Sequence, residues 1–199
     1  MPYFLGDYLK QNSGVDLTMD VTNYSQVLSS LLQYEIDFAL ISDDPENIKF
    51  EKFDLIQNEL FLVGSNTSSN TLSGEKAITE STFLFREEGS RTRLVMENFI
   101  AKNKIKIKKK IELTSNEAVK QAVIAGIGYS IMPLIGIRNE IENGLLKIIP
   151  MKGLPIQTTW RLIWLKEKRL SPIAESYLQY LEKEKETIIK NYFSLPNHQ

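Results

Sequence analysis

The chain has 199 residues, of which 42% are hydrophobic and 25% charged, and such a composition is typical of a globular domain whose core needs no disulfide or metal. The absence of cysteine excludes disulfides and thiolate sites, and a formal net charge of −1 excludes a global attraction to nucleic acid or to an anionic membrane. The single histidine, His198, lies beside the last residue, which excludes a Ser-His-Asp triad and a histidine metal centre.

Helical and strand patterns alternate along the first part of the chain. Met1 to Gln11 predicts the end of an amphipathic helix, and Val15 to Val21 alternates apolar with polar residues as a half-buried strand does. Helical spacing follows over Tyr24 to Gln33, and Ile36 to Ser42 is a short apolar strand typical of parallel sheets. Together these elements predict a right-handed βαβ unit. Leu55 to Val63 adds one or two more strands.

A polar loop from Ser65 to Gly74 leads into a second α/β series. Within it, Thr114 to Glu117 fits a capping box at the start of a helix. Ser171 and Pro172 begin a closing helix that runs to about Asn191. The elements of the second series are predicted as strands at Thr82–Phe85, Lys108–Leu113, Tyr129–Met132, Leu145–Ile149 and Thr159–Leu165, and helices at Ser90–Asn103, Asn116–Ala125 and Leu134–Asn143. Two consecutive α/β series favour two lobes, with a ligand in the cleft between them.

The segment from Phe83 to Arg93, FLFREEGSRTR, has the most chemical content. A buried strand runs into a turn at Gly89, and Ser90 is a suitable N-cap for the helix that follows. Arg91 and Arg93 then fall in the first turn, where cations oppose the helix dipole. A bound carboxylate or phosphate would reverse that unfavourable term and satisfy the backbone N–H groups. The pattern therefore indicates an anion site.

Arg86 is the preferred ligand contact, because it ends a strand at the predicted edge of the cleft. Arg91 and Arg93 are two positions apart and point to different sides of a helix, so both cannot face one ligand. The alternative is that these arginines pair with Glu87, Glu88 or solvent.

Two further junctions between a strand and a helix carry short polar side chains. Thr22 and Asn23 form one, and Thr114 and Ser115 form the other. Each junction could contact a ligand, and each could simply cap a helix. Gly126 to Gly128 lacks the third glycine of a dinucleotide fingerprint, which we therefore reject. Five lysines between positions 104 and 110 are explained by an edge strand without nucleic acid.

Four stretches resemble the effector-binding domain of LysR-type transcriptional regulators. Met1 to Lys10 resembles the end of the first helix, and Gln33 to Ser42, QYEIDFALIS, resembles an early strand. Arg86 to Arg93, REEGSRTR, is similar to the loop REPGSGTR, with Arg91 in place of a glycine. Thr114 to Pro133, TSNEAVKQAVIAGIGYSIMP, resembles the helix, Gly-x-Gly and short strand that mark the fold.

The resemblance implies an α/β protein with a two-lobed periplasmic-binding-protein-like (type II) fold. Each lobe is a sheet flanked by helices, and two crossover strands near Leu60–Ser65 and Arg161–Lys166 join them. We expect residues 1–64 plus 166–199 to form the first lobe and residues 65–165 the second. The first strand of the family domain and its helix-turn-helix are not among these residues.

The resemblance also implies a ligand-sensing regulatory domain that binds a small anionic metabolite, a carboxylate or a phosphate, between the lobes. The implied contacts are Thr22, Asn23, Arg86, Gly89, Ser90, Thr92 and Ser115, with Arg91 and Arg93 as additional candidates. No catalytic residue, cofactor or metal is expected.

We expect a cytoplasmic homodimer that is tetrameric at full length, without a signal peptide or membrane span, in which DNA is bound only through the missing N-terminal domain. The implied dimer surface is the strand Val15–Val21 and the first helix of one subunit against a second-lobe helix of the other. A free-standing small-molecule binding protein of the same fold is the alternative, and a small carboxylate-processing enzyme is a third reading.

Overall fold

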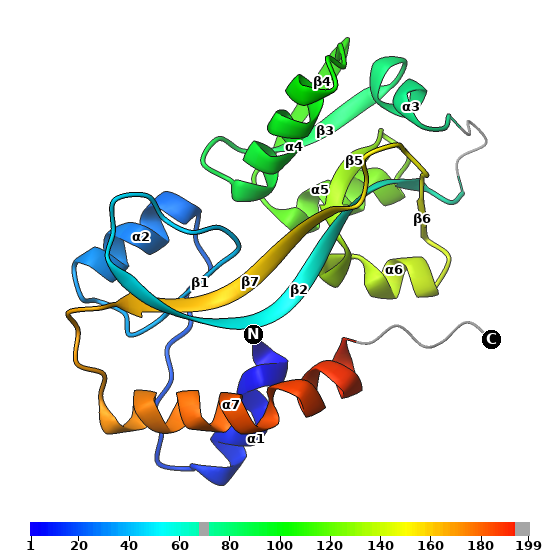
Figure 1. Cartoon of the computed structure of the whole chain (residues 1–199). Helices are drawn as coiled ribbons and strands as arrows, with labels where there is room; N and C mark the ends of the chain where they lie inside the picture. The colour runs from blue at the N-terminus through cyan, green and yellow to red at the C-terminus, as the bar shows by residue number, and fades with distance from the viewer. Residues whose placement is uncertain (68–71, 194–199) are drawn as a thin grey trace. The chain divides into compact units, whose positions relative to one another are not determined.

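A computed structural model describes residues 1–67 and 72–193 and divides the chain into two compact units. The first unit contains Met1 to Ile56 and the residues from Trp160 on, and the second contains Gln57 to Thr159. Two long strands, β2 (Phe50–Ser65) and β7 (Ile156–Leu165), each have residues in both units and are neighbours in one sheet (Figure 1). Both units are mixed α/β, as the sequence predicts. The units divide in the middle of these strands, whereas the predicted lobe boundaries lie at the strand ends.

The first unit is made of α1 (Pro2–Gln11), α2 (Tyr24–Leu32), β1 (Ala39–Ile41) and α7 (Pro172–Tyr192) with the adjoining parts of β2 and β7. The predicted helices are confirmed here. The start of α7 follows from its sequence: Ser171 Oγ accepts a hydrogen bond from the Ala174 N–H at 3.3 Å, and proline occupies the first turn.

The two terminal helices of the described chain pack on each other through their apolar faces. Phe4 and Tyr8 of α1 and Leu181 of α7 belong to one buried cluster. The Tyr8 hydroxyl donates to the Ile173 carbonyl at 3.1 Å, so the polar end of this buried ring has a hydrogen-bond partner. A second cluster in this unit joins α2 to β1 and β7.

The predicted strand at Val15–Val21 is wrong. No strand is assigned there, and Leu17, Met19 and Val21 are 48%, 48% and 90% exposed. Alternation selects the two faces of a strand, but a strand also needs a neighbour to satisfy its backbone groups. No strand among residues 1–67 and 72–193 pairs with this segment. The first βαβ unit is therefore not formed, and β1 pairs antiparallel with β7 through Ala39 opposite Ile163.

The second unit has two groups of paired strands. In one group β3 and β4 are parallel, with Arg86 opposite Leu113, and in the other β2 pairs antiparallel with β5 and β6. The elements are α3 (Glu75–Thr79), β3 (Thr82–Arg86), α4 (Arg91–Lys102), β4 (Lys109–Leu113), α5 (Asn116–Ile124), β5 (Ser130–Pro133), the 3₁₀ turn η1 (Leu134–Gly136), α6 (Arg138–Glu142) and β6 (Leu146–Ile148). The parallel pair fits the predicted strand–helix–strand order, and β4 lies at its edge, as the lysines indicate.

Two local predictions in this unit differ from the structure. The helix predicted at Leu134–Asn143 is divided into η1 and α6, because the fully buried Ile137 between them has φ −130°. The predicted capping box is also wrong. The N-cap of α5 is Ser115, and the Glu117 carboxylate pairs with Lys120 at 2.8 Å instead of closing the box.

Gly128 marks the closest backbone approach in the second unit. A Cβ at this position would overlap the carbonyl oxygen of Thr82 on β3. The same oxygen accepts a hydrogen bond from the Tyr129 N–H at 3.1 Å. The Gly-x-Gly sequence thus lets the chain before β5 lie against β3, a role in packing and not in nucleotide binding.

Four residues of the predicted polar loop, 68–71, lie outside the described part of the chain, and so does His198.

Candidate functional site

The arginine segment forms a strand end, a turn and a helix start in the second unit. β3 ends at Arg86, Gly89 turns the chain with φ +85°, and α4 begins after Ser90. Ser90 is the N-cap, as predicted: it is 7% exposed, and its Oγ accepts a hydrogen bond from the Arg93 N–H at 3.5 Å. Thr92 follows in the first turn and is half-buried. Because the first N–H groups of a helix have no acceptor within it, this turn offers backbone donors to an anion.

Arg86 carries one acidic partner. Its Nε donates to Glu87 Oε2 at 2.7 Å and its Nη2 donates to Glu87 Oε1 at 2.7 Å. The two side chains are 16% and 20% exposed. Burial is the largest single influence and works to raise the pKa of Glu87. The hydrogen bonds from Arg86, a backbone hydrogen bond and the positive charges of Arg86 and Arg93 together outweigh it and hold that pKa below its ordinary value. The alternative given by the sequence, that the arginines pair with neighbouring glutamates, therefore holds for Arg86, whose partner is Glu87.

Arg93 has several partners. Its Nε donates to Glu97 at 2.7 Å, and its Nη1 donates to Glu112 at 2.5 Å and to the Arg86 carbonyl at 3.2 Å. Glu88 is farther away, 3.8 Å from Nη2. The hydrogen bond with Glu97 raises the pKa of Arg93, and Glu112 adds to that effect against the cost of burial. Arg93 thus joins α4 to β3 and β4, which favours a structural role over ligand contact.

Arg91 is half-buried in the first turn of α4. Its predicted role as an additional ligand contact stays a prediction.

Ser115 lies at the same edge of the parallel pair as Arg86. β3 and β4 run in the same direction with Arg86 opposite Leu113, so the chain leaves both strands at one end of the pair. Ser115 is exposed, and its Oγ accepts from the Ala118 N–H at 3.0 Å as the N-cap of α5. The second unit therefore collects Arg86, Gly89, Ser90 and Ser115 at one sheet edge.

Thr22 and Asn23 lie in the first unit, at the start of α2. Asn23 is the N-cap, and its Oδ1 accepts from the Gln26 N–H at 3.0 Å. Thr22 is exposed, with its hydroxyl 3.5 Å from the Asn23 carbonyl oxygen. Capping accounts for the Asn23 side chain, and ligand contact by this junction stays a prediction.

Sequence reasoning missed two of the acids that hold Arg93. Glu97 follows Arg93 by four positions, a spacing at which helix side chains meet, so it could have been found. Glu112 reaches Arg93 from β4, and no local pattern signals that contact.

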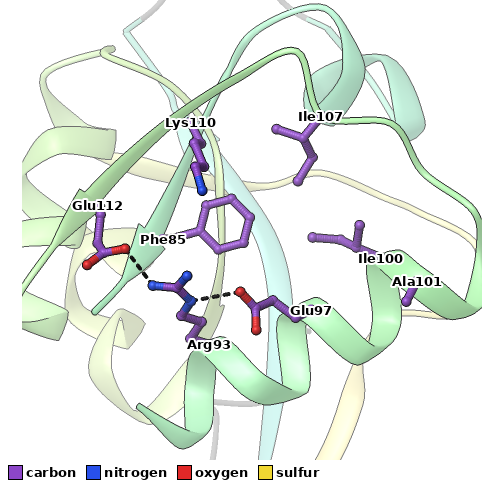
Figure 2. A pocket seen from close by; sticks show the side chains of 8 residues that line it. All are labelled: Phe85, Arg93, Glu97, Ile100, Ala101, Ile107, Lys110 and Glu112. Carbon is purple, nitrogen blue, oxygen red and sulfur yellow. Dashed lines mark hydrogen bonds and ion pairs between the residues drawn. The ribbon is translucent and has the colours of Figure 1, made fainter. Parts of the chain in front are cut away.

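A pocket of about 250 Å³ lies beside this network, within the second unit (Figure 2). Figure 2 shows the Arg93 guanidinium between Glu97 and Glu112, with the Lys110 side chain directed at the ring of Phe85. Of the predicted contacts, only Arg93 lines the pocket. The full lining is Phe85, Arg93, Glu97, Ile100, Ala101, Ile107, Lys110 and Glu112.

Within the described residues, no group of three or more acidic, histidine or cysteine side chains could hold a metal ion. No helix in the same part of the chain is long and apolar enough to cross a membrane.

The comparisons with known proteins agree with this fold. Residues 1–186 match the family model of the LysR substrate binding domain, and the chain belongs to this family. One similar solved structure is the regulatory domain of CcmR from Synechocystis PCC6803 in complex with 2-PG, with a TM-score of 0.83 and 26% sequence identity to this chain. The superposition covers 98% of this chain and 92% of the CcmR chain. The type II periplasmic-binding-protein-like fold predicted from the sequence is thereby confirmed.

Two curated relatives are regulators of transcription. The transcriptional activator CmpR from a Synechocystis strain is 32% identical over 185 residues, and a RuBisCO operon transcriptional regulator from Allochromatium vinosum is 34% identical over 185 residues. These alignments cover 91% and 90% of this chain. The chain spans 60% and 61% of the length of these two relatives.

Proposed function

We propose that this chain is the ligand-sensing part of a LysR-type transcriptional regulator and that it binds a small anionic metabolite at the arginine segment. One observation carries the proposal: Arg86, at the carboxyl end of β3, is placed with the buried N-cap Ser90 and the Ser115 junction at one edge of the parallel pair. Guanidinium, hydroxyl and helix N–H groups together recognise carboxylates and phosphates. Gly89 and Thr92 complete this set, and Thr22 and Asn23 are the contacts expected from the first lobe.

The ligand class follows from the same groups. The site offers cations and hydrogen-bond donors, which suit an anion with several oxygens. The CcmR regulatory domain binds 2-phosphoglycolate, a compound with both a phosphate and a carboxylate. Phosphorylated carboxylates are therefore the first compounds to test on this chain.

Regulation would follow from a shift in conformation. A ligand that binds one arrangement of lobes or subunits more tightly favours that arrangement, and the DNA-binding part of the whole protein senses the change. The whole protein would be a cytoplasmic DNA-binding regulator, dimeric through this domain and tetrameric at full length. The domain would bind its ligand without transforming it.

Thermal unfolding in the presence of carboxylated and phosphorylated metabolites tests the proposal. A ligand at 100 times its dissociation constant adds about 2.7 kcal/mol to the free energy of unfolding. For a domain of this size the melting temperature should rise by roughly 5–10 °C. Arg86→Ala should abolish the rise, whereas Arg138→Ala, which removes an arginine from α6 in the same unit, should preserve it.

A cooperative melt that no carboxylate or phosphate shifts would contradict the proposal. An equal shift in Arg86→Ala would place the ligand elsewhere.

A further inference from the structure

The guanidinium that we propose as the anion ligand already holds a carboxylate of its own chain. Two parallel N–H···O bonds of 2.7 Å join Arg86 to Glu87, and each oxygen of the carboxylate accepts one of them. Both side chains are mostly buried. Glu87 thus presents to Arg86 the same planar pair of oxygens that a carboxylate or phosphate ligand would present.

We propose that Glu87 is a built-in competitor that sets the affinity and the chemical class of the ligand, which must displace it from Arg86. This inference rests on the proposed function. Removal of a partner from a mostly buried guanidinium is costly, so the incoming group must replace both hydrogen bonds. A carboxylate or a phosphate can do so, because each has two charged oxygens at the required spacing. A halide cannot.

The local backbone allows such an exchange. The turn is held by its main chain, since the Ser90 N–H donates to the Glu87 carbonyl at 3.3 Å and Gly89 supplies the left-handed φ. Neither feature depends on the Glu87 carboxylate. The carboxylate can therefore leave Arg86 by rotation of its side chain while the turn and the N-cap of α4 stay in place.

Glu88 provides a matched control. It is the next residue in the same turn and also acidic, but its side chain is 88% exposed and its cationic contact is a 3.8 Å approach to Arg93. Glu87→Gln and Glu88→Gln remove the same charge from the same turn. The loss of one negative charge should strengthen anion binding by a similar amount in both variants. Only Glu87→Gln also removes the carboxylate that holds Arg86.

The test is calorimetric titration of the chain and both variants with 2-phosphoglycolate, inorganic phosphate and chloride. We expect Glu87→Gln to bind 2-phosphoglycolate about tenfold more tightly than the unaltered chain, and Glu88→Gln to bind within about twofold of the unaltered chain. Glu87→Asp, whose carboxylate stands one methylene closer to the backbone, should bind with intermediate affinity. Chloride should compete with 2-phosphoglycolate less strongly than inorganic phosphate does in the unaltered chain.

The outcomes separate the two proposals. If the unaltered chain binds through Arg86 and Glu87→Gln binds equally or more weakly, Glu87 positions the arginine and the competitor idea is wrong while the proposed function stands. If the unaltered chain binds and Glu87→Gln binds more tightly while Glu88→Gln does not, the inference is supported. If neither binds any of the anions while both melt cooperatively, Arg86 is not an anion ligand and both proposals fail.

Discussion

Arg86 and Arg93 are seven positions apart, and their partners give them different roles. Among residues 1–67 and 72–193, Arg86 has a single acidic partner, from the same turn, whereas Arg93 is held by carboxylates from α4 and β4 and by the Arg86 carbonyl. A guanidinium with several partners in different elements is costly to release, since each lost bond leaves a charge in a partly buried place. Under the proposed function, Arg86 is therefore the arginine that we expect an anion to bind.

The Arg86–Glu87 pair predicts how stability depends on pH. Because the pKa of Glu87 is lowered in the folded chain, the pair contributes its full stability above the ordinary glutamate pKa of about 4.3 and loses it as the pH falls through the lower folded value. Melting temperatures measured from pH 6 down to about pH 3 should fall less steeply in Glu87→Gln than in the unaltered chain. Parallel curves would show that the pair contributes nothing measurable.

Gly128 allows a substitution whose result follows from geometry alone. In Gly128→Ala the new methyl group overlaps the Thr82 carbonyl oxygen, so the chain before β5 must move away from β3. We expect a loss of at least about 1–3 kcal/mol in the free energy of unfolding, measured by denaturant titration. Gly136→Ala is the control, because a Cβ there meets no atom within 4 Å, and a change within about 0.5 kcal/mol is expected. Equal stability of the two variants would contradict the close approach.

Helix α7 packs on the first unit through one apolar face. One face of this helix of 21 residues carries the buried Tyr177, Leu181 and Ile188, and the opposite face carries charged residues. Isolated helices gain little stability from propensity, so the attachment of α7 comes from the apolar contacts of that face.

Truncation of Leu181 measures that attachment. The side chain is fully buried, so Leu181→Ala should lower the free energy of unfolding by about 2–5 kcal/mol. Ile173→Ala, at a residue of the same helix that is 45% exposed, should cost clearly less. Denaturant midpoints with unchanged slopes provide the comparison, and a similar loss in both variants would argue against the packing of α7 described above.

Among the segments without regular structure, Val15–Val21 shows most clearly how an element depends on its neighbours. Its pattern of apolar and polar residues suits a strand, yet three of its apolar side chains are exposed and no strand of the described chain pairs with it. Apolar side chains gathered on one exposed segment are typical of a surface that another chain covers.

For the whole molecule we predict a homodimer that uses this segment. Size-exclusion chromatography with light scattering should give twice the mass of the chain. Met19→Glu, in the exposed segment, should shift the protein toward the monomer, because a charge at an apolar interface is costly to bury. Ile173→Glu, at a similarly exposed position on α7, should leave the dimer intact. A monomeric unaltered chain would make the prediction wrong.

The division of the chain into two units can be compared with the division predicted from the sequence. The alternation of strands and helices predicted an α/β protein, and the family resemblance implied two crossover strands; β2 and β7 each have residues in both units. The predicted strands Leu55–Val63 and Thr159–Leu165 are shorter than β2 and β7, and β2 also carries polar residues such as Glu51 and Asn58. Asn58 is 5% exposed, and its side chain accepts from the Ile135 N–H at 3.3 Å.

The sequence by itself determined the elements whose signals are local. The N-caps Ser90 and Ser171, the turn at Gly89 and the amphipathic helices were all predicted, because caps, left-handed glycines and helical periodicity depend only on residues within a few positions. Local strings also indicated the family. Only the tertiary structure decided which strand pairs with which and which acid holds each arginine. Those choices depend on neighbours that are far apart in sequence, as Glu112 is from Arg93, and on whether a strand finds a partner for its backbone at all.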